Sequence, residues 1–315
     1  MKFRSALWQA GALLAAVLLA WFFLSNTLHN LETRRIASGF GFLGREAGFE
    51  IGETGFIAYS AADSYLRALG VGLANTFRVA VLGVVLATLL GTLLGLARLS
   101  PNWLLAKLAA AYVEIMRNVP LLVQLFFWYA LISENLPGPR EALQPLPGVF
   151  LSNRGIVFPT PWSTPVLSGF NFTGGTALSP EFAALLVGLV TYTAAFIAEI
   201  VRAGILSIDR GQIEAAYSIG LTRGGALRFV VLPQALRLIV PPMTSQYLNL
   251  TKNSSLAVAI GYPDLVSIAN TTMNQTGQAI EGVAIIMAVY LTISLSISAF
   301  MNSYNRRVAL RGLGR

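Results

Sequence analysis

Between Gly211 and Pro233 the chain reads Gly-Gln-Ile-Glu-Ala-Ala-Tyr-Ser-Ile-Gly, then nine residues, then Val-Val-Leu-Pro. The stretch is polar, carries arginines and lies between two long apolar segments. Its acid, Glu214, is followed by two alanines and then by Gly220, which predicts a short helix that a partner can approach closely. We interpret the stretch as a cytoplasmic loop of a membrane protein. The alternative is an amphipathic helical hairpin lying on the membrane.

The composition independently indicates a membrane protein. Hydrophobic residues make up 55% of the 315 residues and charged residues 11%, whereas a soluble domain carries roughly a quarter charged residues. The net charge of +8 does not indicate nucleic-acid binding, because the basic residues flank apolar runs and do not cluster with aromatic side chains. With no cysteine and a single histidine, His29, disulfides and thiolate nucleophiles are excluded and no metal site is expected.

Six apolar runs are long enough to cross a hydrocarbon core about 30 Å thick. The first follows Lys2 and Arg4, but it is too long for a signal peptide and lacks a clear cleavage site, so we expect a retained anchor. The sequence thus predicts an all-α transmembrane fold of six helices, in which residues 1–24 form the first unit, 25–68 an external segment and 69–315 a five-helix core. The runs are Ala6–Leu24, 69–97, 108–132, 182–206, 238–260 and 282–304.

The distribution of basic residues predicts that both termini are cytoplasmic. With the N-terminus inside, the cytoplasmic segments hold thirteen Lys and Arg residues, the external segments hold six, and three lie within spans. This orientation places the 207–237 loop and the 305–315 tail in the cytoplasm. The thirteen are Lys2, Arg4, Arg98, Lys107, Arg202, Arg210, Arg223, Arg228, Arg237, Arg306, Arg307, Arg311 and Arg315.

Two long segments are expected outside. Residues 26–67 mix glycine-rich turns with apolar residues and can lie on the membrane surface. Residues 135–180 hold 8 prolines and 6 glycines, which breaks any long helix. Because long loops in compact proteins are commonly functional, we interpret the second segment as a lid that faces a periplasmic partner.

The spacing within Gly211–Pro233 resembles the Glu-Ala-Ala loop of ABC importer permeases, and Gln212 after Gly211 resembles the polar amino-acid branch of that family. The resemblance implies a type I, MetI-like five-helix core with one extra N-terminal helix, and docking of an ATPase on this loop. The chain has no phosphate-binding loop and no nucleophile elbow. We therefore expect a non-enzyme without catalytic residues or cofactor, with ATP and Mg used by the partner ATPase. The residues implied in coupling are Arg210, Gly211, Gln212, Glu214, Ala215, Ala216, Gly220, Leu232 and Pro233.

Polar residues inside the spans are candidates for the substrate path, because charges in a bilayer cost about 2.5–3.5 kcal/mol each on insertion scales. The stretch from Tyr112 to Gln124 resembles a Glu-x-x-Arg-x-x-Pro-Leu-Leu-x-Gln motif of polar amino-acid permeases, and the fifth span carries a matching Lys followed by polar residues. The candidates are Glu114, Arg117, Asn118, Pro120, Gln124, Thr193, Glu199, Arg202, Asn249, Lys252, Asn253, Ser254 and Ser255.

Each charged pair also has a structural interpretation. Glu114 and Arg117 share a helix face and can pair with each other. Lys252 can pair with Glu199 or Glu114 instead of binding a carboxylate. We also expect the fifth helix to be broken by the Pro241-Pro242 pair.

Taken together, the resemblance implies a permease subunit of an ATP-driven importer of L-amino acids, with broad polar and acidic specificity and alternating access, similar to the general L-amino-acid subgroup. The implied partners are a second, homologous permease in a heterodimer, an ATPase dimer, a periplasmic binding protein, the amino acid and membrane lipid, in the inner membrane and without nucleic acid. A permease restricted to one substrate, such as glutamate or glutamine, stays open. An ion-driven secondary transporter would need inverted repeats that the sequence lacks.

Overall fold

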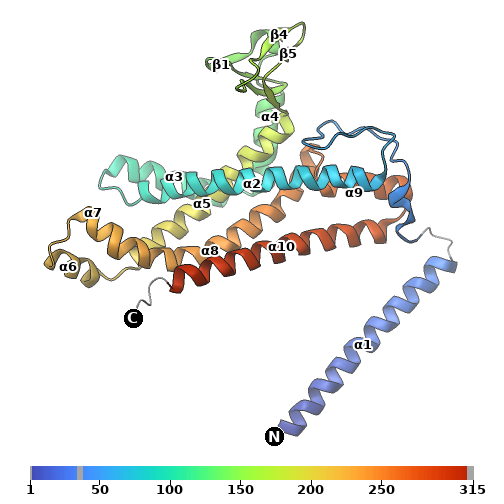
Figure 1. Ribbon diagram of the computed structural model, residues 1–315, viewed down its shortest axis with the longest axis horizontal. Coiled ribbons are helices and arrows are strands. Elements are labelled where there is room, and N and C mark those ends of the chain that lie inside the picture. The colour runs from blue at the N-terminus through green and yellow to red at the C-terminus, as the bar shows by residue number, and fades with distance from the viewer. Residues whose placement is uncertain (1, 34–37, 311–315) are drawn as a thin grey trace.

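The computed structural model describes residues 2–33 and 38–310, so Arg34, Arg35, Arg311 and Arg315 lie outside the described residues. The fold is mostly helical (Figure 1). Within the described part, five helical segments are long and apolar enough to cross a membrane, and one bent helix pair can serve as a sixth span. The five contain α1 (Lys2–Thr33), α2 (Tyr65–Ala97), α5 (Pro180–Leu206), α8 (Leu232–Asn253) and α10 (Ala279–Leu310).

The third predicted span is two helices rather than one. α3 (Trp103–Asn118) and α4 (Leu121–Ser133) meet at an angle of 105° around Pro120. Proline lacks an N–H, which leaves the carbonyl of Met116 without its helical partner. The side chain of Gln124 donates to that carbonyl at 2.9 Å and to the carbonyl of Val119 at 3.0 Å. The break is thus stabilised from within, as a membrane interior requires.

The prediction that Pro241 and Pro242 break the fifth helix was wrong. α8 runs as helix through Pro241 and Pro242, because neighbouring helices α5 and α10 support it. The regular helix ends only at Asn253, where the 3₁₀ segment η4 (Ser254–Ile260) begins. This segment stops at Gly261, which adopts φ 80°. A further helix that the sequence analysis missed, α9 (Leu265–Thr276), follows; the side chain of Asp264 caps it.

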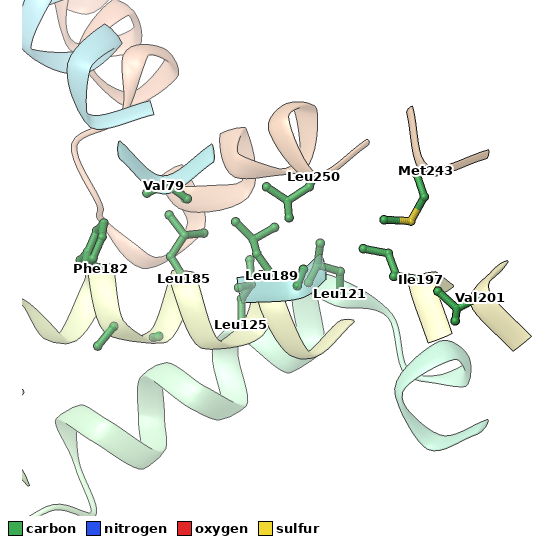
Figure 2. Close-up of a cluster of buried hydrophobic side chains, with 14 of the residues drawn as sticks. Val79, Leu121, Leu125, Phe182, Leu185, Leu189, Ile197, Val201, Met243 and Leu250 are labelled. Atoms are coloured by element: carbon green, nitrogen blue, oxygen red, sulfur yellow. The ribbon is translucent and has the colours of Figure 1, made fainter. Parts of the chain in front are cut away.

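α5 lies at the centre of the bundle and contacts α2, α3, α4 and α8. Its buried leucines pack on residues of α2, α4 and α8 (Figure 2). The contact with α2 is the most extensive and involves small residues. A Cβ added at Gly91 would lie 2.6 Å from the Cβ of Ile197 and 2.8 Å from the carbonyl of Ala194, and one at Gly95 would lie 2.8 Å from the carbonyl of Ala198. The two backbones therefore touch, as is typical of helix pairs in lipid.

The segment before α2, for which we keep the name external segment, packs on the helices instead of lying free. It contains a short 3₁₀ turn, η1 (Phe40–Gly44), and buries Phe42, Ala47 and Ile51 against α2 and α9. At its start, the side chain of Glu281 on α10 accepts from the backbone N–H of Gly39. The structure thus replaces the expected membrane-surface segment with one that is fixed to the core.

The segment between α4 and α5 contains strands that the sequence analysis did not predict. After a 3₁₀ turn, η2 (Pro139–Glu141), a four-stranded antiparallel sheet has the order β1-β2-β3-β6. A separate hairpin joins β4 and β5, and Phe150 of the sheet stacks on Phe172 of the hairpin at 4.6 Å between ring centroids. This segment between α4 and α5, which we call the strand insertion, projects from the helices (Figure 1). The strands are β1 (Leu143–Leu146), β2 (Val149–Ser152), β3 (Gly155–Phe158), β4 (Val166–Ser168), β5 (Asn171–Thr173) and β6 (Thr176–Leu178).

The α2–α5 contact leads to a test with a matched control. Gly91→Ala forces a methyl group into the backbone of α5 and should destabilise the protein by about 1–3 kcal/mol. Gly70→Ala lies on the same helix, where an added Cβ meets nothing within 4 Å, so it should be neutral or stabilising by up to about 1 kcal/mol. Thermal denaturation of the two purified variants in detergent compares them. Equal melting temperatures would refute the close contact.

Candidate functional site

The predicted coupling stretch folds into a compact surface element, which we call the knob (residues 207–233). Its first helix, α6 (Arg210–Ser218), is capped by Asp209, whose side chain accepts from the N–H of Gly211 at 2.7 Å. The helix ends where Gly220 adopts φ 86°. The N–H of Leu221 then bonds the carbonyl of Ala216 at 3.1 Å and that of Gly220 bonds Tyr217 at 2.9 Å, the pattern of a Schellman stop.

The rest of the knob returns the chain to the bundle. α7 (Arg223–Ala226) is capped by Thr222, and a π-helical turn, η3 (Leu227–Val231), leads directly into α8 with Pro233 near its start. α6 and α7 lie at the end of the bundle away from the external segment (Figure 1). The knob is thus joined to α5 at one side and to α8 at the other.

The knob presents apolar side chains outward. The side chain of Ala216 is buried, with 2% of its surface exposed, whereas Glu214 and Ala215 are exposed. Ile219 and Phe229 are 78% and 64% exposed. A concentration of large apolar side chains at a polar surface is typical of a protein-binding site. The other predicted coupling residues, Arg210, Gly211, Gln212, Leu232 and Pro233, are also exposed.

Glu199, a predicted substrate contact, is already paired with arginines. It bonds Nη2 of Arg202 at 2.7 Å and also forms an ion pair with Arg98, which caps the end of α2. Lys252 forms no ion pair among the described residues, so the alternative in which it pairs with Glu199 is wrong. The charge of Glu199 ties α2 to α5 at the end nearest the knob.

The α3 candidates are exposed and do not pair with each other. Arg117 lies over the ring of Phe196, with its guanidinium carbon 5.2 Å from the ring centroid, and the described ion pairs include none to Glu114. Asn118 donates to the backbone carbonyl of Glu114 at 2.8 Å. The expected Glu114–Arg117 ion pair is therefore absent from the described part of the chain.

The candidates of the fifth span divide between backbone contacts and a cavity. The hydroxyls of Ser254 and Ser255 donate to backbone carbonyls at 2.8 Å. Lys252 and Ser255 line a cavity of about 570 Å³ together with residues of α9 and α10, among them Tyr290. Asn249 is exposed, Asn253 is half-buried and Thr193 is buried within α5. None of the candidates from α3, α4 and α5 lines this cavity.

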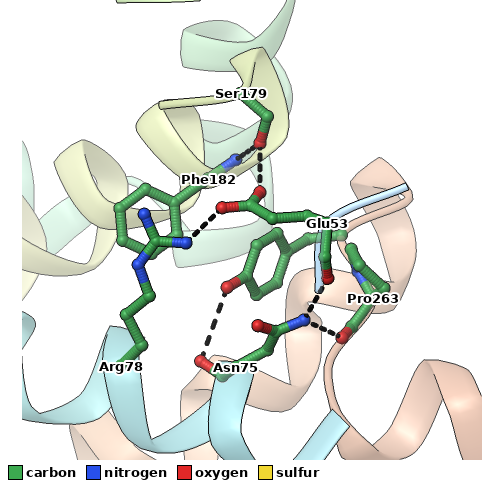
Figure 3. A network of polar contacts seen from close by, with 7 residues as sticks. Glu53, Asn75, Arg78, Ser179, Phe182 and Pro263 are labelled. Carbon is green, nitrogen blue, oxygen red and sulfur yellow. Dashed lines mark hydrogen bonds and ion pairs between the residues drawn. The ribbon is translucent and has the colours of Figure 1, made fainter. Parts of the chain in front are cut away.

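A polar network at the opposite end was not assigned from the sequence (Figure 3). Glu53 of the external segment forms an ion pair with Arg78 of α2 and accepts from the hydroxyl of Ser179 at 2.6 Å. Ser179 caps α5 by accepting from the N–H of Phe182, and the Arg78 guanidinium lies 4.2 Å from the centroid of the Phe182 ring. Asn75 donates to the carbonyl of Glu53 at 2.8 Å.

The sequence contained a signal for this network. Arg78 interrupts the second span, and a buried cation needs a counter-charge. The partner lies 25 positions earlier, in a segment without helical periodicity, so spacing could not identify it.

Two cavities open next to the network. One, of about 420 Å³, is lined by Glu53, Ser179, Glu181 and residues of α9. The other, of about 630 Å³, lies between the strand insertion and the start of α5 and shares these three residues. The structure thus has two polar cavities at one end and the exposed knob at the other, and the Lys252 cavity is lined by residues of α8, η4, α9 and α10.

Comparisons with known proteins agree on one family. Residues 83–310 match the family of binding-protein-dependent transport system inner membrane components. The chain is 46% identical to the putative amino-acid ABC transporter permease protein YhdX of Escherichia coli K12, over 98% of this chain and 94% of that protein. It is 42% identical to the general L-amino acid transport system permease protein AapQ of Rhizobium johnstonii, over 98% and 93%.

Solved structures support the same conclusion. The chain resembles a crystal structure of an amino acid ABC transporter with histidines, with a TM-score of 0.58 and 29% identity over 77% of this chain and 95% of that one. Its fold is also that of the MetNI methionine ABC transporter, with a TM-score of 0.51 over 78% and 95%, which confirms the MetI-like architecture. The chain therefore belongs to the binding-protein-dependent transport system inner membrane components, as a non-catalytic permease subunit of the amino-acid ABC transporter type.

Proposed function

We propose that this permease imports L-amino acids of broad polar and acidic character by alternating access, driven by a separate ATPase. The observation that carries the proposal is the knob: a capped helix with a Schellman stop and exposed apolar side chains. Three residues separate this helix from α5, and the last turn of the knob continues directly into α8. A rigid knob can pass the closure of an ATPase on to the helices as a rigid-body movement. ATP and Mg belong to that ATPase dimer.

We further propose that the permease works beside a second, homologous permease and receives substrate from a periplasmic binding protein. The outward faces of α1 and α10 carry many exposed large apolar side chains, which lipid or a second permease would cover. The strand insertion and the external segment supply the surface for the binding protein. Both termini and the knob are cytoplasmic in this proposal, and the domain limits are residues 1–24, 25–68 and 69–315.

The substrate path is proposed to run past the Lys252 cavity. Lys252 offers a cation for a carboxylate, and Asn253 offers a donor and an acceptor without charge. Glu114, Arg117, Asn118 and Thr193 stay in the proposed path. Glu199 pairs with Arg202, and Gln124 bonds the carbonyls at the Pro120 break. In this proposal these three residues affect the substrate path indirectly, by fixing the positions of the helices. A permease restricted to glutamate or glutamine shares all of these features.

The proposed function is tested by uptake into proteoliposomes. The complex of both permeases and the ATPase, supplied with its binding protein, should take up labelled glutamate and glutamine only when ATP is present. Gly220→Val should insert into the membrane but lose most of its ATPase and its uptake, because a β-branched residue at φ 86° is strained and unravels the helix stop.

Gly224→Val is the matched control. Gly224 lies in the same knob, is exposed, and has no neighbour within 4 Å of an added Cβ and no positive φ. It should keep near-normal uptake. Wild-type uptake in Gly220→Val would remove the knob from the mechanism, and ATP-independent uptake would contradict the proposed function itself.

The orientation is tested separately in this naturally cysteine-free chain. Ser168→Cys on the strand insertion and Ser218→Cys on the knob are both exposed. A membrane-impermeant maleimide added to intact spheroplasts should label the first and not the second, and should label both after lysis. Labelling of only Ser218→Cys in intact cells would reverse the topology.

A further inference from the structure

The larger external cavity has the size and lining of a small-molecule site. It measures about 630 Å³ and lies between the strand insertion and the first turn of α5. Ligand pockets of small molecules commonly fall between about 300 and 1,000 Å³. Most of its lining residues have polar side chains, and they come from four separate parts of the chain: the external segment, α4, the strand insertion and α5.

Three charged residues line this cavity, and in the described part of the chain only one of them has an oppositely charged partner. Glu53 is already compensated, because it pairs with Arg78 and accepts from Ser179. Arg154, in the turn between β2 and β3, and Glu181, in the first turn of α5, also line the cavity. Neither takes part in an ion pair among the described residues, so they lie more than 4.0 Å apart.

The cavity therefore presents one uncompensated cation and one uncompensated carboxylate that leave space between them. The charges sum to zero: the Glu53–Arg78 pair contributes none, and Arg154 and Glu181 cancel. The hydroxyl of Tyr129 donates to Glu181 at 3.3 Å and holds one end of this arrangement. A ligand that fits carries an anionic and a cationic group on one small frame.

We propose that this cavity is an entry site for a free L-amino acid, distinct from the Lys252 cavity. The carboxylate binds Arg154, whose guanidinium can donate two parallel hydrogen bonds to it, and the ammonium group binds Glu181. The neutral amides of Asn153 and Asn171, which line the same cavity, can donate to or accept from different polar side chains. This proposal rests on the proposed function, because it assigns an early binding site on the same import path.

The site is tested by binding of labelled L-glutamine to the purified complex in nanodiscs, without binding protein. Two analogues separate the two charges: N-acetyl-L-glutamine lacks the ammonium group and L-glutamine α-amide lacks the carboxylate. Wild type should prefer L-glutamine over both. Arg154→Gln should weaken glutamine binding about tenfold or more and lose the preference against the amide, since one charge-assisted contact is removed.

Glu181→Gln should lose the preference against the N-acetyl analogue instead, and the exchange Arg154→Glu with Glu181→Arg should restore part of the binding. Arg140→Gln is the control, because Arg140 belongs to the same insertion but lies over Phe170, outside the cavity. Unchanged affinity and unchanged analogue preference in both single variants would overturn the entry site. The proposed function fails in a different way, by loss of ATP-dependent uptake in the wild-type complex.

Discussion

The backbone contact between α2 and α5 is the constraint on which the other features depend. Lipid gives helices no hydrophobic reason to associate, so close packing of small residues must hold them together. Gly91 and Gly95 meet the carbonyls of Ala194 and Ala198 with no space for a side chain. Because α5 also contacts α3, α4 and α8, the position of α2 on α5 sets the geometry of the bundle.

Ion pairs secure the same two helices at both ends. At the external end, Glu53 joins Arg78 of α2 to Ser179, the cap of α5. At the other end, Glu199 of α5 joins Arg98 at the end of α2. These charges cost free energy to bury, and each is compensated by a partner or a hydrogen bond. The pair α2–α5 therefore forms one unit between the cavities lined by Glu53 and the knob.

Much of this fold follows from the sequence because its causes are local. Long apolar runs predict the spans, and Gly220 predicts the end of the first helix of the knob. The bend at Pro120 also has a local cause, but its angle depends on how α4 packs on α5, which no local pattern contains. The strands of the insertion are three or four residues long, too short for a recognisable alternation.

The candidate site was less predictable, because it depends on which sides of the helices pack against each other. Helical spacing shows that Lys252 and Ser255 share a face, and both do line one cavity. It cannot show that Glu199 faces Arg98, 101 positions earlier. Glu53, Arg154 and Glu181 lie in three separate segments, and only the tertiary fold brings them to one cavity.

The central claim is that the α2–α5 unit moves as a rigid body between the knob and the external end. Spin labels on Leu66→Cys, exposed at the start of α2, and Ser218→Cys, at the end of α6, measure it by pulsed electron paramagnetic resonance. The account predicts the same distance within this chain in nucleotide-free and in ATP–vanadate-trapped complex, while distances between the ATPase subunits change. A shift of several ångströms between the two labels would contradict it.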